Sequence, residues 1–283
     1  MSPQSAAEWY IGTMGFSYAD WSGVFYPADL PAHKRLGYYS RIFNAVEIDS
    51  TFYGTPRPES VRGWAASTPA EFRFSVKVPR QFTHDAGLVG VQGELLQFIH
   101  TVQLLEEKLG AILFQFPPSF GPDRSPALHA CLAGLPGGVR YAVEIRHPSW
   151  YTAENEPGSS AAGLSVAGEP ALAQMLRDFG VCWAATEYPD LPRRIFRTAD
   201  FLYLRWIGQH GTFQHHDQER IDRTAQLQQW WEVLQGVSPQ ISMVFGFFNN
   251  DYAGFAAGTA NRFKKLTDLP FRPFQLPQQG TLF

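Results

Sequence analysis

The chain is poor in cysteine, has no long apolar run and carries no large excess of charge of either sign. Its two cysteines, Cys131 and Cys182, show no paired spacing and no neighbouring cluster of histidines. A disulfide framework and a structural zinc site are therefore both disfavoured. The net charge of −3 and the sequence pI of about 6.2 argue against a protein that holds nucleic acid by bulk electrostatics, which usually needs a basic face.

Three further absences concern location and cofactors. No stretch approaches the roughly 18 apolar residues of a membrane span. The N-terminus lacks a basic segment followed by an apolar run, so no signal peptide is expected. The glycine-rich phosphate loops of nucleotide enzymes are also missing. We therefore expect a cytoplasmic protein with no membrane partner and no nucleotide cofactor.

Short apolar runs recur along the chain, and most of them end in a charged or amide side chain. Room for a helix follows most of them, and this alternation over 283 residues predicts an α/β fold, a single (β/α)₈ TIM-type barrel covering residues 1–269. The active site of such a barrel lies at the C-terminal ends of its strands. The eight runs span residues 10–15, 45–51, 73–78, 111–116, 140–146, 181–187, 201–206 and 242–250.

The segments between the apolar runs differ in how well they suit a helix. Residues 188–199 hold too many prolines for a good helix, so the sixth unit should be irregular. The small, polar stretch 155–170 predicts a flexible loop, and residues 270–283 predict a C-terminal tail without periodicity. Helices are expected over residues 31–43, 59–66, 93–108, 126–135, 217–234 and 254–266.

Side-chain alternation predicts which strand residues point into the barrel. Glu47 and Asp49 share one face of their run, and the same rule turns further polar residues inward, namely Lys77, Gln115, Glu144, Arg146 and Arg205. Isolated buried charges are costly, so these groups must pair, bind a ligand or meet water. One interpretation is a structural ion-pair network. The other is an anion site, in which Lys77, Arg146 and Arg205 hold a phosphate or carboxylate.

Proton transfer and metal binding are both open to this set of residues. Glu47 and Glu144 could divide general acid and base duties if their environments separate their pKa values, or they could simply balance the arginines. His84 follows the third run and could transfer protons, or it could be a loop-packing residue. Together with Glu187, these groups could ligate magnesium or manganese, although the nearby cations would compete for the carboxylates.

Aromatic residues follow several expected strands, where loops are usually polar. Trp21, Tyr53 and Trp150 could stack on a sugar or a nucleobase, with Gln115 and Asn249 as polar substrate contacts. The alternative is a lid of rings that packs over the top of the barrel.

The last five residues read "QGTLF" and resemble the short peptide by which bacterial DNA polymerases and repair proteins bind the sliding clamp. In this hypothesis Gln279 occupies a polar subsite, while Leu282 and Phe283 fill an apolar pocket. The alternative is that Leu282 and Phe283 pack on the barrel.

Six sequence blocks carry a wider resemblance. They are "IGTMGFSYADWSGVFYP", "VEIDSTFYGTP", "FSVKVPRQFTH", "KLGAILFQFPPSF", "VEIRHPSW" and "FFNND". In this order they resemble the domain-of-unknown-function 72 family, also called YecE-like. The resemblance implies a TIM-type barrel but no established activity. Glu187 stands where an aspartate is more usual in that family, "RWIGQHG" replaces a more compact pattern, and residues 155–170 look like an insertion.

Together these patterns predict an enzyme of the hydrolase or lyase type that binds a phosphate-bearing or otherwise anionic substrate. If the tail is a clamp peptide, the substrate becomes nucleic acid, with the sliding clamp as partner. One alternative is a small-molecule enzyme on a sugar or sugar phosphate with a structural tail. Another is a non-catalytic binding module.

Overall fold

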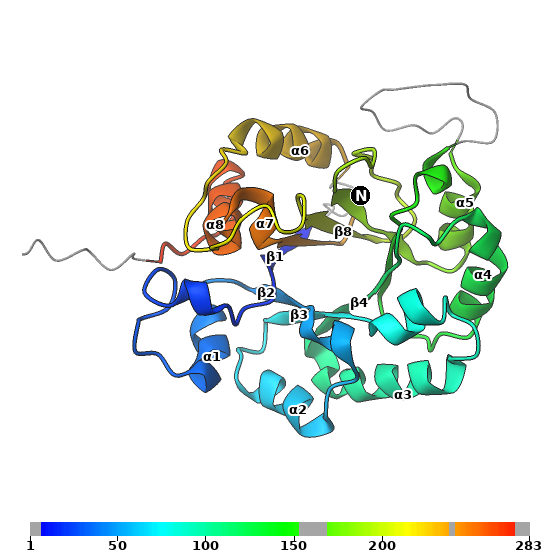
Figure 1. Cartoon of the computed structure of the whole chain (residues 1–283), viewed down its shortest axis with the longest axis horizontal. Helices are drawn as coiled ribbons and strands as arrows, with labels where there is room; N and C mark the ends of the chain where they lie inside the picture. Colours follow the sequence, from blue (N-terminus) through cyan, green and yellow to red (C-terminus); the bar gives the residue numbers. More distant parts are fainter. Residues whose placement is uncertain (1–6, 153–168, 238–240, 275–283) are drawn as a thin grey trace, which may run out of the picture.

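A ring of parallel strands surrounded by helices forms the protein in the computed structural model, which describes residues 7–152, 169–237 and 241–274 (Figure 1). The strands are β1 (Glu8–Met14), β2 (Ala45–Ile48), β3 (Arg73–Lys77), β4 (Leu109–Gln115), β5 (Tyr141–Glu144), β6 (Cys182–Trp183), β7 (Ala185–Glu187), β8 (Phe201–Trp206) and β9 (Met243–Phe248). The α-helices are α1 (Arg35–Tyr39), α2 (Pro58–Ala66), α3 (Gln92–Val102), α4 (Ser125–Ala133), α5 (Ala171–Asp178), α6 (Thr224–Val237), α7 (Asn250–Ala253) and α8 (Ala256–Leu266).

The barrel closes through one residue. The sheet order is β6-β5-β4-β3-β2-β1-β9-β8-β7, so its two ends are the short strands β6 and β7. Only Ala184 separates them, and its N–H donates to the carbonyl of Val143 at 2.9 Å. The sixth apolar run therefore pairs with β5 through its first half and with β8 through its second half. This split gives nine strands instead of the expected eight, and it leaves almost no free sheet edge.

Several helices differ from the sequence expectation. The helix expected over residues 93–108 ends as α3 at Val102 and continues as a 3-10 segment in which Glu106 has φ 53°. The helix expected from residue 217 begins only at Thr224, where the Asp222 carboxylate accepts from the backbone N–H at 2.9 Å and from the hydroxyl. Along the described residues 188–199 no helix forms, as the prolines predicted.

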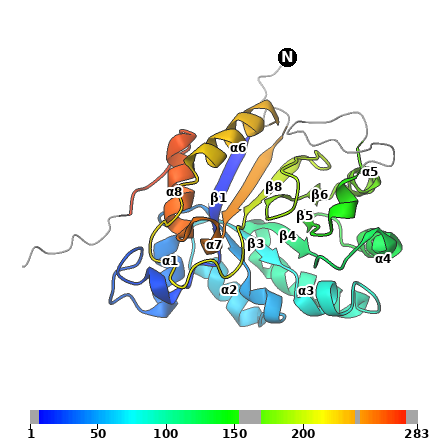
Figure 2. The same ribbon diagram turned by 45° about the horizontal axis from the view of Figure 1, so that its top comes forward.

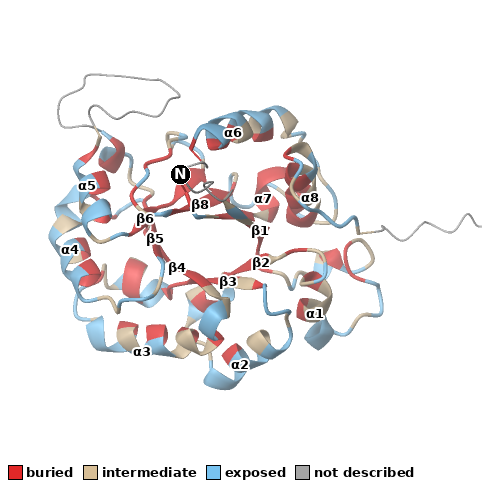
Figure 3. Ribbon diagram, turned by 180° about the vertical axis from the view of Figure 1, so that it is seen from behind, coloured by how far each residue is buried: buried red, intermediate tan, exposed pale blue. Residues whose placement is uncertain are grey.

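Two apolar layers hold the fold together. Figure 3 shows buried positions on the strands and on the helix faces that point toward them, with exposed positions on the outside. The barrel interior is filled by inward side chains such as Met14, Leu113, Phe245 and Phe247. In Figure 2 the helices α2, α3, α4 and α5 surround the part of the ring that contains β3, β4, β5 and β6. The inner layer thus forms the floor beneath the polar residues at the strand ends.

The first residues of the expected tail pack on the barrel. The Phe274 ring lies 5.0 Å from that of Phe25 and 5.9 Å from that of Phe255, centroid to centroid. Arg272 donates to the carbonyl of Arg41 at 3.0 Å. Most of the loop 155–170, and all three motif residues Gln279, Leu282 and Phe283, lie outside the described residues. None of the helices in the described ranges is long and apolar enough to span a bilayer.

Candidate active site

The centre of the site is Arg205 on β8, which connects carboxylates from two distant strands. Its Nε and Nη2 donate to Oε2 and Oε1 of Glu47 on β2, at 2.9 and 2.8 Å. Its Nη1 donates to Oε2 of Glu144 at the end of β5. Glu47 and Glu144 are fully buried and Arg205 is 4% exposed. All three guanidinium nitrogens are therefore engaged inside the barrel.

Two neighbours complete this network. The Arg146 Nε donates to Oε1 of Glu144 at 2.7 Å, and the Tyr203 hydroxyl donates to Oε2 of Glu47 at 2.8 Å. Two carboxylates and two guanidinium groups thus balance in charge. Charge-assisted bonds to Arg205 and Arg146 outweigh burial and lower the pKa of Glu144 to about 2. Glu144 is therefore ionised throughout the neutral range. This arrangement is the ion-pair network that the sequence left open as one interpretation.

Lys77, the last residue of β3, stands apart from this network. Its Nζ lies 3.9 Å from the centre of the Phe52 ring, and among the described residues this amine makes no hydrogen bond or ion pair. Burial, reinforced by repulsion from Arg205, lowers the pKa of Lys77 to about 8. An appreciable fraction of this amine is consequently neutral near physiological pH.

Asp49 follows β2 and titrates closer to neutrality than an ordinary aspartate. Burial, together with repulsion from Glu47, raises its pKa to about 6, although Lys77 acts in the opposite direction. In the part of the chain that the structure describes, no ion pair reaches its carboxylate. Side-chain alternation predicts that Asp49 points inward, but the sequence assigns this residue no chemical role. Lys77 and Asp49 form a pair of groups with shifted pKa values at one end of the barrel, which is a common feature of functional sites.

His84 lies on a π-helical turn, Gln81–Asp85, that follows β3. Its ring is partly buried and meets the Phe52 ring edge-on at 5.0 Å, and its Nδ1 lies 2.8 Å from the Thr83 hydroxyl. Burial, and the cations Lys77, Arg146 and Arg80, lower its pKa to about 4. His84 is therefore neutral at physiological pH and sits among positive charges.

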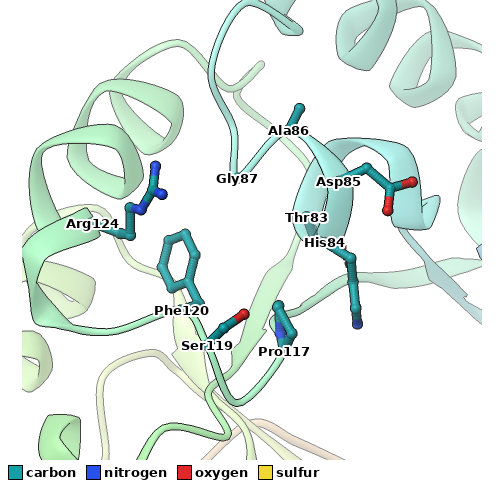
Figure 4. A pocket seen from close by; sticks show the side chains of 9 residues that line it. All are labelled: Thr83, His84, Asp85, Ala86, Gly87, Pro117, Ser119, Phe120 and Arg124. Carbon is teal, nitrogen blue, oxygen red and sulfur yellow. Dashed lines mark hydrogen bonds between the residues drawn. The ribbon is translucent and has the colours of Figure 1, made fainter.

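A small cavity of about 90 Å³ opens beside His84. Figure 4 shows Phe120 and Arg124 facing the segment that contains His84 and Gly87 across this space. Of the site residues predicted from the sequence, only His84 lines this cavity, and Lys77 does not. It lies beside the mouth and extends the site toward the loop after β4.

A second polar cluster, absent from the predicted site, lies after β9. Asp251 accepts from His210 Nδ1 at 3.1 Å and from the Gly211 N–H at 3.2 Å, and its other oxygen lies 3.4 Å from His216 Nε2. Asp20 in turn accepts from the His216 N–H at 2.9 Å. Asp20 and Asp251 lie 196 and 35 residues from His216 along the chain, so only the fold brings these groups together.

The aromatic residues predicted to bind substrate have different environments. Trp21 is fully buried against Tyr18 and Phe25, so it is not available for stacking. Trp150 is 5% exposed, and its indole N–H donates to the carbonyl of Phe120 at 2.7 Å. Both therefore pack the barrel top. Tyr53 is 85% exposed and remains available to a ligand.

The predicted amide contacts make local bonds. Gln115 is paired in register with Glu144, and its side-chain amide donates to the carbonyl of Phe116 at 2.6 Å. The side-chain oxygen of Asn249, Oδ1, accepts from the backbone N–H of Asp251 at 2.9 Å and so caps α7. The side-chain nitrogen, Nδ2, lies 3.6 Å from the Met14 sulfur. Both residues lie next to the mouth of the barrel, but the contacts of their side chains stabilise the local fold.

Glu187 points away from the other candidate metal ligands. Its carboxylate accepts from the Trp230 indole at 2.7 Å and the Tyr252 hydroxyl at 2.9 Å, and pairs with Arg193 at 2.7 Å. Glu47 and Glu144 are engaged by Arg205. In the described ranges no three residues with histidine, cysteine or carboxylate ligands are placed to hold a metal ion together.

Comparison with known proteins identifies relatives over most of the chain. A family model described as "Protein of unknown function DUF72" matches residues 10–281. The UPF0759 protein YecE of Escherichia coli (strain K12) is 29% identical over 232 residues, which cover 79% of this chain and 82% of YecE. The UPF0759 protein YunF of Bacillus subtilis (strain 168) is 27% identical over 290 residues, which cover 97% of this chain and 99% of YunF.

Solved structures agree with the barrel. A DUF72 family protein from Thermotoga maritima MSB8 has a TM-score of 0.75 and 28% identity, covering 92% of this chain and 99% of that chain. A DUF72 family protein from Enterococcus faecalis V583 has a TM-score of 0.71 over 94% of this chain and 98% of that chain. At 20% identity the second likeness supports the fold alone.

Proposed function

We propose a function on the premise that this chain belongs to the DUF72 family, a family whose description assigns no activity. The protein is an enzyme of the hydrolase or lyase type that binds a phosphate-bearing or otherwise anionic substrate at the mouth of its barrel. One observation carries the proposal. Lys77 is a nearly buried cation without an ion-pair partner among the described residues, beside a network in which the other buried charges are matched.

An anionic ligand would balance this charge. An unpaired buried cation destabilises a fold, and a bound anion removes that penalty while gaining charge-assisted hydrogen bonds. Arg146 can take part, because only its Nε is used by Glu144 and its side chain keeps 18% exposure. The cations that depress the pKa of His84 support a positive potential at the same place. Arg205, predicted to hold the anion directly, instead orients the carboxylates.

Proton transfer is assigned to groups that titrate near neutrality. Glu144 is held ionised by its arginines and is a poor proton carrier at neutral pH. Glu47 pairs with the same guanidinium group, that of Arg205. We therefore assign both glutamates to positioning the neighbouring side chains and not to proton transfer. Asp49 and Lys77, with pKa values of about 6 and 8, are better suited to change their protonation state near neutral pH. Neutral His84 can offer a hydrogen bond to the substrate.

Thermal stability in phosphate and in sulfate tests the anion site. Either ion should raise the melting temperature of the wild type, since a ligand that binds only the folded state stabilises it. The double change Lys77→Ala, Arg146→Ala should abolish that rise. The exposed pair Arg62→Ala, Lys265→Ala removes the same charge from α2 and α8 and should leave the rise intact. A rise that persists in the first variant would refute this anion site.

Recruitment by the sliding clamp is a second candidate, which would make the substrate nucleic acid. The chain is anchored on the barrel as far as Phe274, and the motif residues Gln279, Leu282 and Phe283 come only a few positions later. A peptide of residues 275–283 should bind a bacterial clamp weakly, with a Kd on the order of micromolar. Leu282→Ala with Phe283→Ala should abolish binding. A peptide that does not bind would favour a small-molecule enzyme on a sugar or sugar phosphate.

Turnover separates both enzyme candidates from a binding module. A non-catalytic module would show the phosphate response of the melting temperature and no conversion of any anionic substrate. Asp49→Asn keeps the shape of the mouth but removes an ionisable group. An enzyme should lose activity in this variant while keeping the phosphate response, whereas a binding module has no activity to lose.

A further inference from the structure

We propose that Lys77 is a nucleophile, and that its amine forms an imine with the carbonyl group of an anionic aldehyde or ketone. This rests on the proposed function, because it names the substrate class and the covalent step of the same site. The substrate would carry a carboxylate or phosphate close to its carbonyl. Arg146 would bind that anion, and Asp49 would move a proton at the carbon next to the imine.

Position and surroundings single out this lysine. It is the last residue of β3, at the barrel end where Glu144 and Gln115 also finish their strands. Its Nζ contacts the face of Phe52 and has no carboxylate partner in the described chain. An ion pair with a carboxylate would hold the amine protonated and unreactive, whereas burial beside another cation, here Arg205, favours the neutral amine that can attack. Lys77 retains 9% exposure, so solvent still reaches it.

The step balances without any further reactant. The neutral amine attacks the carbonyl carbon, a C–N bond forms, and the carbonyl π electrons pass to oxygen. A proton then moves from the nitrogen to this oxygen and gives a neutral carbinolamine. Loss of that oxygen as water, with one more proton, leaves an iminium ion. The net change is one ammonium group and one carbonyl converted into one iminium ion and one water. The iminium then withdraws electrons from the neighbouring carbon, whose bond to hydrogen or carbon can break, as a lyase requires.

The chain offers an internal control for this reactivity. Lys264 on α8 is 6% exposed, its pKa is also lowered to about 8 by burial, and its Nζ lies 5.8 Å from the centre of the Phe43 ring. It resembles Lys77 in burial, acidity and aromatic contact. It differs in place, because it belongs to an outer helix and not to the end of a strand. If Lys77 reacts and Lys264 does not, the reactivity comes from the position of Lys77 at the barrel mouth and not merely from burial of an amine.

Reductive trapping tests the inference. The full-length protein is treated with glyoxylate and cyanoborohydride near pH 8, and peptide masses locate the reduced adduct. Lys77 should be modified on the order of tenfold more than Lys264. Acetaldehyde, which has no anionic group, should label Lys77 much less, and phosphate should compete with glyoxylate. Absence of an adduct at Lys77, or equal labelling of Lys77 and Lys264, would overturn the inference.

A second variant separates this inference from the anion site. Lys77→Arg keeps a cation but removes the primary amine, so it should retain the phosphate-induced rise in melting temperature and give no adduct at position 77. If the wild type responds to phosphate but forms no adduct, the anion site stands and the imine fails. If neither occurs, both proposals fail. Should Lys77→Arg not fold, the comparison of Lys77 with Lys264 inside the wild type still decides.

Discussion

Arg205 donates two parallel hydrogen bonds to Glu47, one from Nε to Oε2 at 2.9 Å and one from Nη2 to Oε1 at 2.8 Å. The two residues are 158 positions apart and join β8 to β2 across the barrel. Because Glu144 takes the remaining nitrogen, the guanidinium cannot turn toward a ligand. Glu47, Glu144, Arg146 and Arg205 thus form a rigid ion-pair network at the centre of the barrel, which we call the platform. Lys77 and Asp49 lie beside this platform, and their side chains remain free to do chemistry.

Breaking this platform should destabilise the fold. Glu47→Gln leaves the buried guanidinium of Arg205 short of a counter-charge, and we expect a loss of about 3–5 kcal/mol in the free energy of unfolding, measured with urea. Asp85→Asn removes the partner of Arg80 in an ion pair that is half exposed. That control should change stability by less than about 1 kcal/mol. Equal losses of stability in Glu47→Gln and Asp85→Asn would contradict a stabilising role for the platform.

The carboxyl of Asp49 should impose a pH dependence on stability. Its pKa is about 6 in the folded protein and near 3.8 when unfolded, so the folded state binds the proton more tightly. The stability that this adds is fully present below pH 3.8 and is lost as the pH rises through 6. Asp49→Asn, compared with wild type by urea unfolding at pH 4 and pH 8, should gain relative stability at pH 8. The gain should be at most about 3 kcal/mol, since one pKa unit is about 1.4 kcal/mol. A difference that does not vary with pH would contradict the shift.

Two aromatic residues should behave in opposite ways. Trp21 is fully buried, so Trp21→Ala should lower the free energy of unfolding by about 3–5 kcal/mol through the cavity it leaves. Tyr53 is 85% exposed, so Tyr53→Ala should change stability by no more than about 0.5 kcal/mol. Substrate affinity should fall in Tyr53→Ala if the ring stacks on the ligand. A Trp21→Ala variant of wild-type stability would refute the burial described above.

Asp251 should hold the loop that carries His210 and His216. Its carboxylate accepts hydrogen bonds from His210 Nδ1 and the Gly211 N–H. Asp251→Ala should therefore cost about 1–3 kcal/mol and increase amide hydrogen exchange in residues 208–217. His210→Ala is the matched control, since its side chain is 96% exposed, and it should leave exchange in that segment nearly unchanged. Unchanged exchange in Asp251→Ala would contradict this role of the carboxylate, and faster exchange in both variants would mean that the carboxylate holds the loop through its bond to His210.

The DUF72 motifs, the barrel and the irregular sixth unit could be predicted from the sequence alone. Apolar runs with a period of two, separated by amphipathic stretches, are local signals, and the prolines within residues 188–199 disfavour a helix there. Alternation along each strand also indicated that Glu47, Lys77, Glu144 and Arg205 turn inward. Each of these inferences depends only on neighbours along the chain.

The partners of those inward charges were decided by the tertiary structure. Whether Arg205 holds an anion or a carboxylate depends on the distance to Glu47 and Glu144, which only the closed barrel determines. The same holds for Glu187, which meets Trp230 instead of the mouth, and for Trp21, which is sealed in the core. Sequence therefore determined which side chains are present and which way each strand faces. Pairing, burial and pKa depend on atoms brought together from distant parts of the chain, so only folding could assign them.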